Sequence, residues 1–329
     1  MSVRISVVIP NHNGSATIGT CLQSLFSSRY PAFEVVVVDD CSSDSSIDII
    51  RHFPCRLIRF DHHAGASKAR NAGARESSGD ALFFIDADCV VQEDTLARVA
   101  DAFLGNPDRI IGGSYAPVAY DDSFYSTFQS VFINYSELKN QEPDYIASHA
   151  MVIGTEIFVK NGGFPEAFMP ILEDVEFSHR LKRNGVRLLM DSSILVRHIF
   201  NFDLRRSLRN AVKKSKYWTG YSLKNSDITR DSGTASHELK INAASACLFL
   251  LFLLCFMISL ESFFLLFAVI IGMTNLVLNR RLIQAFFRAK GQSFGIRATL
   301  YYCLIYPWAV IAGGLSGTML YVQSRRAAL

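Results

Sequence analysis

Three long runs without a charged side chain fill most of the last quarter of the chain, and they restrict its possible folds more than any other feature. The runs contain 19, 17 and 26 residues and extend over 242–260, 262–278 and 298–323. A helix needs roughly 20 mostly apolar residues to cross a bilayer. We therefore predict a transmembrane region over residues 241–329 with about three spanning helices.

Charged residues are divided unevenly between the two parts of the chain. Residues 1–240 contain 26 Lys and Arg against 29 Asp and Glu, whereas residues 241–329 contain 7 against 1. The formal net charge of +3 is thus the sum of a negative charge on the first part and a larger positive charge on the second. It does not indicate a nucleic-acid partner.

The basic residues of the last part predict an orientation in the membrane. Five of them lie in the loop 279–297, and the positive-inside rule places this loop and the N-terminal part in the cytoplasm. The seven cysteines contain no Cys-x-x-Cys pair, which fits a reducing compartment. We predict a multi-pass protein of the plasma (inner) membrane. Because a third full span would place Arg325 and Arg326 outside, a hairpin or re-entrant segment around Pro307 remains an alternative.

Residues 204–240 connect the two parts, and we predict that they form a basic amphipathic helix followed by a linker. On a helical wheel one sector is apolar and the next is basic. The apolar sector contains Leu204, Leu208, Ala211, Val212 and Trp218, and the basic sector contains Arg205, Arg206, Arg209, Lys213, Lys216 and Lys224. This pattern favours a helix lying on an anionic membrane surface, and a solvated helix face is the alternative.

Short apolar runs alternate with helix-like segments in the N-terminal part. The expected strands are 5–9, 34–38, 56–60, 81–85 and 186–190, and the expected helices are 17–26, 45–52, 67–76, 93–103 and 175–183. Such alternation is typical of βαβ units. We predict an α/β domain over residues 1–203, with a Rossmann-like, mostly parallel sheet covered by helices on both faces.

Acidic residues follow three of the expected strands, where a parallel sheet binds its ligands. They are Asp39-Asp40, Asp86-Ala87-Asp88 and Asp191, and Glu173-Asp174 opens an expected helix. Two acids one residue apart point to a hard cation and phosphate oxygens. Each group alone has a structural explanation, since acids also cap turns and favour helix N-termini.

Together these motifs resemble those of the family 2 glycosyltransferases with a GT-A fold. The resemblance covers about two thirds of the chain, in six ordered segments: 6–14, 36–44, 69–73, 79–88, 162–166 and 172–181. His12 departs from the pattern because many members have an aromatic residue there, and this bears on contacts to the base or ribose.

The resemblance implies a nucleotide-sugar donor, a UDP- or GDP-sugar, and roles for particular residues. Pro10, Asn13 and Asp40 would hold the base and ribose, and Arg70 would face the diphosphate unless it is a surface helix residue. Asp86 would contact the ribose or metal-bound water.

The resemblance also implies a divalent cation, Mg²⁺ or Mn²⁺. Asp88 would bind it with Asp86, and His198 would be a further metal ligand or a structural histidine.

The same resemblance implies that Asp174 is the base that accepts a proton from the acceptor, in a single displacement that inverts the anomeric carbon. Glu173 would orient Asp174 or bind the acceptor.

We expect a hexosyltransferase that moves one sugar to a hydroxyl or phosphate of a membrane acceptor, such as a polyprenyl phosphate or a lipid-linked glycan, in cell-envelope glycan synthesis. A processive polysaccharide synthase subunit is the alternative, although the Gln-x-x-Arg-Trp signature is missing around Arg209. A nucleotidyltransferase is less well supported because residues 10–14 contain no Lys or Arg. A catalytically dead scaffold would have lost Asp86, Asp88 or Asp174, which are all present.

Overall fold

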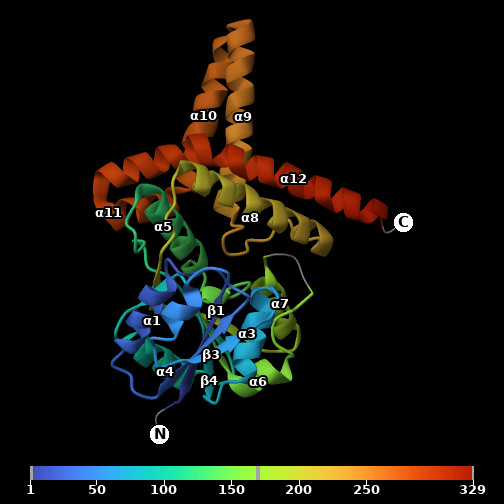
Figure 1. Cartoon of the computed structure of the whole chain (residues 1–329). Coiled ribbons are helices and arrows are strands. Elements are labelled where there is room, and N and C mark those ends of the chain that lie inside the picture. Colours follow the sequence, from blue (N-terminus) through green and yellow to red (C-terminus); the bar gives the residue numbers. More distant parts are fainter. Residues whose placement is uncertain (1–2, 168–170, 328–329) are drawn as a thin grey trace. The chain divides into compact units, whose positions relative to one another are not determined.

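The computed structural model describes residues 3–167 and 171–327, and Figure 1 colours them along the chain. The chain divides into two compact units. The first contains Met1–Asp122 and Glu137–Asn201, and the second contains Ser123–Ser136 and Phe202–Leu329. The third passage between units, at Asn201–Phe202, lies next to the boundary predicted at residue 203. We did not predict that residues 123–136 belong to the second unit.

A sheet of eight strands, in the order β3-β2-β1-β4-β7-β6-β8-β5, forms the centre of the first unit. Its strands are β1 (Ile5–Asn11), β2 (Phe33–Asp39), β3 (Arg56–Arg59), β4 (Ala81–Phe84), β5 (Cys89–Val91), β6 (Ile110–Tyr115), β7 (Met151–Gly154) and β8 (Leu188–His198). The neighbours β3, β2, β1 and β4 are parallel, as are β6 and β8. By contrast, β7 is antiparallel to β4 and β6, and β5 is antiparallel to β8. The mostly parallel sheet that we predicted is therefore confirmed, with two antiparallel strands that we did not predict.

Helices pack against this sheet, and their apolar positions form its core. They are α1 (Ile18–Phe26), α2 (Ser46–Ile50), α3 (Ala66–Arg75), α4 (Thr95–Gly105), α6 (Thr155–Lys160) and α7 (Glu173–Arg183). Val35–Val38 are buried along their whole length, as expected for a strand between two helical layers. In α3 a Cβ on Gly73 would lie 2.5 Å from Val8 Cγ1. Glycine thus lets α3 approach β1 closely.

Strand β8 differs from the strand predicted over 186–190. It begins at Leu188 and continues to His198, so Asp191 lies within the strand and not past its end. The register with β6 shifts between the pairs Gly112↔Met190 and Ser114↔Leu195, which marks an irregularity like a β-bulge. Asp191 Oδ1 accepts a hydrogen bond from Ser193 N at 2.8 Å inside this irregular segment. Asp191 therefore shapes the strand.

The second unit consists of helices. They are α5 (Phe124–Leu138), α8 (Leu204–Asn225), α9 (His237–Ser259), α10 (Ser262–Leu278), α11 (Arg280–Leu300) and α12 (Tyr306–Ala327), with a π-helical turn at Tyr301–Ile305. Two helical segments are long and apolar enough to cross a membrane, among the described residues: His237–Ser259 and the continuous Arg280–Arg325. Helix α10 is apolar but has 17 residues.

The three predicted spans are therefore not clearly present among the described residues. Helices α9 and α10 lie side by side as a hairpin, and α12 crosses the base of the hairpin and runs along α8 (Figure 1). The predicted loop 279–297 is helical, with non-helical backbone only at Lys290 and Gly291. The predicted third span, 298–323, begins within α11 and packs on α8 through small residues.

Two glycines explain the close packing of α12 on α8. A Cβ on Gly313 would lie 2.5 Å from Val212 O, and one on Gly317 would lie 2.3 Å from Lys216 O. Their Gly-x-x-x-Gly spacing places both on one helix face, where it allows close backbone approach. The buried positions of α8 include Ala211 and Trp218, as predicted, but Leu204 is 40% exposed.

Candidate active site

A cavity of about 390 Å³ lies at the carboxyl ends of β1, β2 and β4. Its lining includes seven predicted or neighbouring polar residues: Asn11, His12, Asn13, Asp40, Arg70, Asp86 and Asp88, and Pro10 also lines it. Parallel strands present their ligand sites at this edge. The structure thus brings every predicted donor-binding residue to one cavity.

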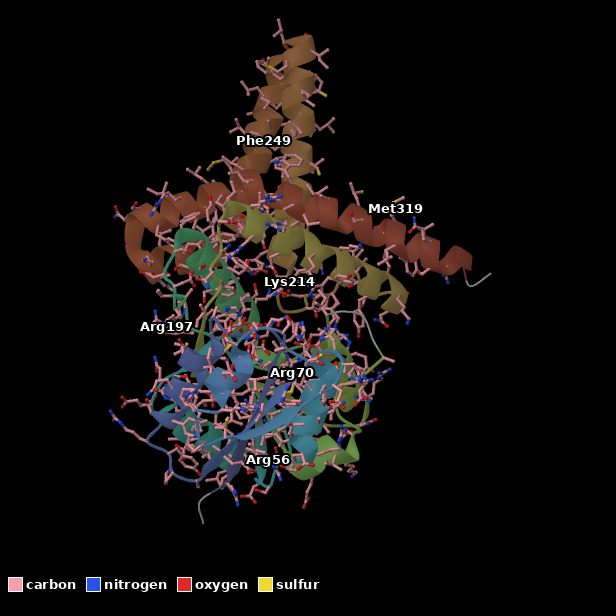
Figure 2. All side chains as sticks on the ribbon, in the orientation of Figure 1. Arg56, Arg70, Arg197, Lys214, Phe249 and Met319 are labelled. Atoms are coloured by element: carbon pink, nitrogen blue, oxygen red, sulfur yellow. The ribbon has the colours of Figure 1, made fainter. Side chains whose placement is uncertain are left out.

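Arg70 of α3, labelled in Figure 2, connects two acidic motifs that are far apart in the sequence. Its Nη1 donates to Glu173 Oε1 and its Nη2 donates to Asp86 Oδ1, both at 2.7 Å. The side chain is 5% exposed, and its guanidinium lies 5.6 Å from the centre of the Phe164 ring. Arg70 is therefore a buried bridge and not a surface helix residue.

Asp86, Asp88 and His198 lie where the end of β4 meets the end of β8. Cys89 is paired with His198 across β5 and β8, so His198 Nε2 lies 3.3 Å from Asp88 Oδ1. That oxygen is buried, and none of the described residues donates a hydrogen bond to it. A carboxylate oxygen in this state lacks the partner that buried polar atoms normally have. Two carboxylates and an imidazole are a donor set that fits Mg²⁺ or, better, Mn²⁺.

The two carboxylates have opposite pKa shifts. Burial alone would raise the pKa of Asp86, but the charge and hydrogen bond of Arg70, together with the charges of His149 and His198, hold that pKa below its usual range. Burial together with the charge of Asp86 raises the pKa of Asp88 to about 7. The charges of His149 and Arg70 lower the pKa of Asp88 but do not offset burial and the Asp86 charge, so a bound divalent cation would stabilise the ionised form of Asp88.

Glu173 and Asp174 form the first turn of α7. Leu172, just before them, has a left-handed backbone with φ of 77°, which is unusual for a branched side chain and occurs most often at functional sites. Asp174 Oδ2 accepts from Ser148 N at 3.1 Å. Burial and the neighbouring Glu173 charge raise the pKa of Asp174 to about 6. Since Glu173 is held by Arg70, Asp174 is the better placed of the two to exchange a proton.

Hydrogen bonds connect the loops around the site predicted for the nucleotide base. Asp40 is buried, with Oδ1 accepting from Ala64 N at 2.6 Å and Oδ2 from Gly65 N at 2.8 Å. Asn13 adopts a left-handed backbone, and its Oδ1 accepts from Ser43 N at 2.9 Å. The Asp40 carboxylate thus fixes the loop before α3. Oδ1 keeps a second lone pair for a ligand, whereas Oδ2 also lies 2.9 Å from His63 Nδ1.

The sequence analysis missed two buried residues behind the metal motif, His149 and Glu137. His149 Nε2 lies 3.3 Å from Glu137 Oε2, and the His149 ring stacks on Tyr115 with centroids 3.9 Å apart. A positive charge on His149 lowers the pKa of Asp86. An isolated histidine between strands gives no sequence signal for this position.

The sequence analysis also missed His63, although its position after an expected strand was a signal. It follows β3, the third of the adjacent parallel strands, just as the predicted Asp40 follows β2. Its Nδ1 lies 2.9 Å from Asp40 Oδ2. The rule that ligands bind past strand ends would have found it.

Comparison with known proteins agrees with this geometry. Residues 6–156 match the family Glycosyl transferase family 2. An uncharacterized glycosyltransferase of Haemophilus influenzae is 31% identical over 185 residues, which cover 54% of this chain and 61% of that protein. The chain thus spans about three fifths of the length of this curated relative.

Solved structures show the same fold. Mannosyltransferase PcManGT from Pyrobaculum calidifontis, in complex with GDP-Man and Mn²⁺, has a TM-score of 0.59 at 16% identity, over 97% of this chain and 88% of that chain. TarS of S. aureus in complex with UDP-GlcNAc has a TM-score of 0.52 at 17% identity, over 98% and 92%. The sheet and its helices therefore have the GT-A fold. Within this fold, the match to glycosyl transferase family 2 covers residues 6–156, a little under half of the chain.

Proposed function

We propose that this protein is a membrane-bound, inverting, metal-dependent glycosyltransferase. It moves one sugar from a UDP- or GDP-sugar to a lipid-linked acceptor, a polyprenyl phosphate or a lipid-linked glycan, for cell-envelope glycan synthesis. Its catalytic part faces the cytoplasm, at the plasma (inner) membrane. The observation that carries the proposal is the Arg70 bridge, because it joins the Asp86 motif to the Glu173-Asp174 motif through two 2.7 Å hydrogen bonds.

The bridge gives the two motifs separate roles. Arg70 holds Asp86 and Glu173 in place through these two hydrogen bonds. Among the described residues Asp174 forms no ion pair of this kind, and its pKa of about 6 suits a group that must be ionised near neutral pH and then accept a proton. Asp174 takes the proton from the acceptor hydroxyl on the face opposite the leaving diphosphate, and this geometry inverts the anomeric carbon.

The donor site is supported by the cavity lining and by the relatives. Pro10, Asn13 and Asp40 surround the place for the base and ribose, and PcManGT and TarS hold GDP-Man and UDP-GlcNAc respectively. A divalent cation would be held by Asp86, Asp88 and His198, and it would supply positive charge for the diphosphate leaving group.

Membrane attachment is supported by the exposed apolar surface of the α9–α10 hairpin. Leu251, Ile258 and Met273 are 54%, 85% and 58% exposed, and exposed apolar surface of this extent marks contact with a partner or a membrane. The 23 residues of α9 extend over roughly 34 Å, enough to cross the hydrocarbon core. Exposed basic side chains of α8, such as Arg205 and Arg209, suit an anionic surface.

A lipid acceptor is supported by a second cavity, of about 280 Å³, inside the second unit. Apolar residues such as Trp218 and Ile311 line it together with Lys214 and Lys240. Apolar walls with two ammonium groups match the chemistry of an isoprenoid or acyl chain that carries a phosphate. Lys240 also donates to the Arg230 carbonyl, and Lys214 on α8 is the residue whose replacement tests the cavity.

Membranes containing the protein should be incubated with a panel of radiolabelled nucleotide sugars. We expect label from one donor in the organic phase, dependent on Mn²⁺ or Mg²⁺ and lost on chelation. Label in a long water-soluble polymer would instead favour a processive synthase. Full transfer after exhaustive chelation would refute the metal assignment.

A further inference from the structure

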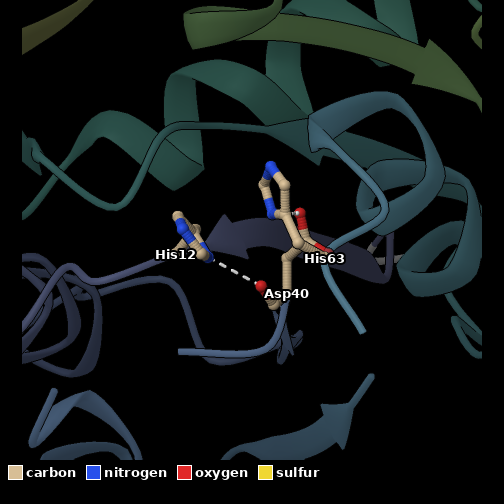
Figure 3. Close-up of side chains that lie close together, drawn as sticks. All are labelled: His12, Asp40 and His63. Carbon is tan, nitrogen blue, oxygen red and sulfur yellow. Dashed lines mark hydrogen bonds and ion pairs between the residues drawn. The ribbon is translucent and has the colours of Figure 1, made fainter. Parts of the chain in front are cut away.

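Three residues at the ends of neighbouring strands form a second group of metal-ligating side chains. His12 follows β1, Asp40 follows β2, and His63 follows β3, and these strands are adjacent in the sheet. One ligand atom from each residue lies within 4.8 Å of the others. Figure 3 shows the three side chains close together, with a hydrogen bond from His12 to Asp40. The sheet topology, and not the sequence order, brings the three together.

Hydrogen bonds already orient the three side chains. Asp40 is held by the backbone N–H groups of Ala64 and Gly65. His12 Nδ1 lies 2.7 Å from the Asp40 carbonyl oxygen, and the tautomer that donates there has its lone pair on Nε2, where Asn13 Nδ2 at 3.1 Å is the contact that a metal ion would replace. A hydrogen bond from one ring nitrogen to a carbonyl is the usual orienting contact of a metal-binding histidine.

The distances are close to those of a coordination sphere. His63 Nδ1 lies 2.9 Å from Asp40 Oδ2, and the rings of His12 and His63 have centroids 4.3 Å apart. Adjacent ligands of a tetrahedral zinc ion, bound at about 2.0–2.1 Å, are separated by roughly 3.3 Å. Both histidines are exposed, so small rotations suffice to reach this spacing around the fixed carboxylate.

We propose that His12, Asp40 and His63 bind a zinc ion, with water at the fourth position, and that this ion blocks the donor. Two imidazoles and one carboxylate are the ligand set of Zn²⁺ sites with an open position, whereas the carboxylate pair Asp86–Asp88 suits harder cations. All three residues line the cavity that contains Asp86 and Asp88. An ion bound to them occupies the part of the cavity proposed for the base. The blocking effect rests on the proposed function, and the metal site itself does not.

Co²⁺ is the probe for the metal site, because in tetrahedral N/O coordination it absorbs visible light much more strongly than in octahedral sites. The purified full chain in detergent is titrated with Co²⁺ in excess Mn²⁺, which fills the Asp88 site. We expect one tetrahedral Co²⁺ that Zn²⁺ displaces. His63→Asn and His12→Phe should each raise its dissociation constant at least tenfold. His62→Asn, at an exposed neighbour outside the group, should leave it unchanged.

Equal Co²⁺ spectra for the parent and for His63→Asn, or no tetrahedral absorption at all, would overturn the metal site whether or not the protein transfers sugar. In transfer assays we expect Zn²⁺ to compete with the nucleotide sugar, and His63→Asn to raise the inhibitory concentration at least tenfold. Zn²⁺ that binds at His63 but leaves the KM for the donor unchanged would overturn the blocking effect alone.

Discussion

Replacing Arg70 by Met should destabilise the first unit severely, because it leaves acidic groups without their buried cation. Arg70 is 5% exposed and forms ion pairs at 2.7 Å with Asp86 and Glu173. Removing one partner of a buried ion pair costs about 3–5 kcal/mol. At about 2–4 °C per kcal/mol for a unit of this size, the melting temperature should fall by about 6–20 °C.

The loss should depend on pH in a defined direction. In the parent, Arg70 holds the pKa of Asp86 below its usual range, so the stability from this pair is present above the unfolded pKa and is lost as pH falls through the folded pKa. In Arg70→Met, burial raises the pKa of Asp86 instead, and proton uptake neutralises it. The difference in melting temperature should therefore be larger at pH 7.5 than at pH 5.

Thermal unfolding of the full chain in detergent measures this difference. Arg75→Met is the matched control on the same helix, because Arg75 is 65% exposed and its nearest acidic oxygen, on Glu166, is 4.0 Å away. It should change the melting temperature by less than about 2 °C. An Arg70→Met protein that melts like Arg75→Met, or that shows the same loss at both pH values, would refute the buried bridge.

Three further results are expected. Because the pKa of Asp88 is raised to about 7 and a bound cation must displace its proton, the dissociation constant for Mn²⁺ should rise about tenfold for each pH unit below 7; a constant value from pH 8 to pH 5.5, by calorimetry, would contradict this. Gly317→Ala should destabilise the second unit by about 1–3 kcal/mol because its Cβ would meet Lys216 O. Gly314→Ala should not, because its Cβ meets only Thr219 Oγ1 at 3.7 Å. Equal resistance of the two variants to proteolysis would refute the close packing. Lys214→Glu should raise the KM for a lipid-phosphate acceptor at least tenfold without changing that for the donor, and an equal effect of Lys213→Glu would contradict a specific cavity.

The sheet and the acidic edge could be predicted because they depend on local patterns. Val35–Val38 and Ala81–Phe84 are short apolar runs, and the acids that follow them must lie at the same edge once the strands are parallel. Strand β8 was underestimated because its irregular segment around Asp191 interrupts the alternating pattern.

The Arg70 bridge and the position of α12 could not be predicted, because each depends on contacts between distant segments. The sequence indicates which helix carries Arg70, but not that Asp86 and Glu173 lie on either side of it. The last apolar run is as long as a membrane span. Only the contacts of Gly313 and Gly317 with α8 show that it packs on another helix.

The role of Asp174 is tested by the turnover of Asp174→Asn with a nucleotide sugar and a hydroxyl acceptor. The amide keeps the shape of the side chain but cannot accept the proton, so kcat should fall by roughly 10²–10⁴ while the dissociation constant of the donor changes little. The parent's kcat should rise with pH through about 6, the pKa of Asp174, and the variant should lose this dependence. A kcat within a few fold of the parent, or a complete loss of donor binding, would contradict the assignment of Asp174 as the base.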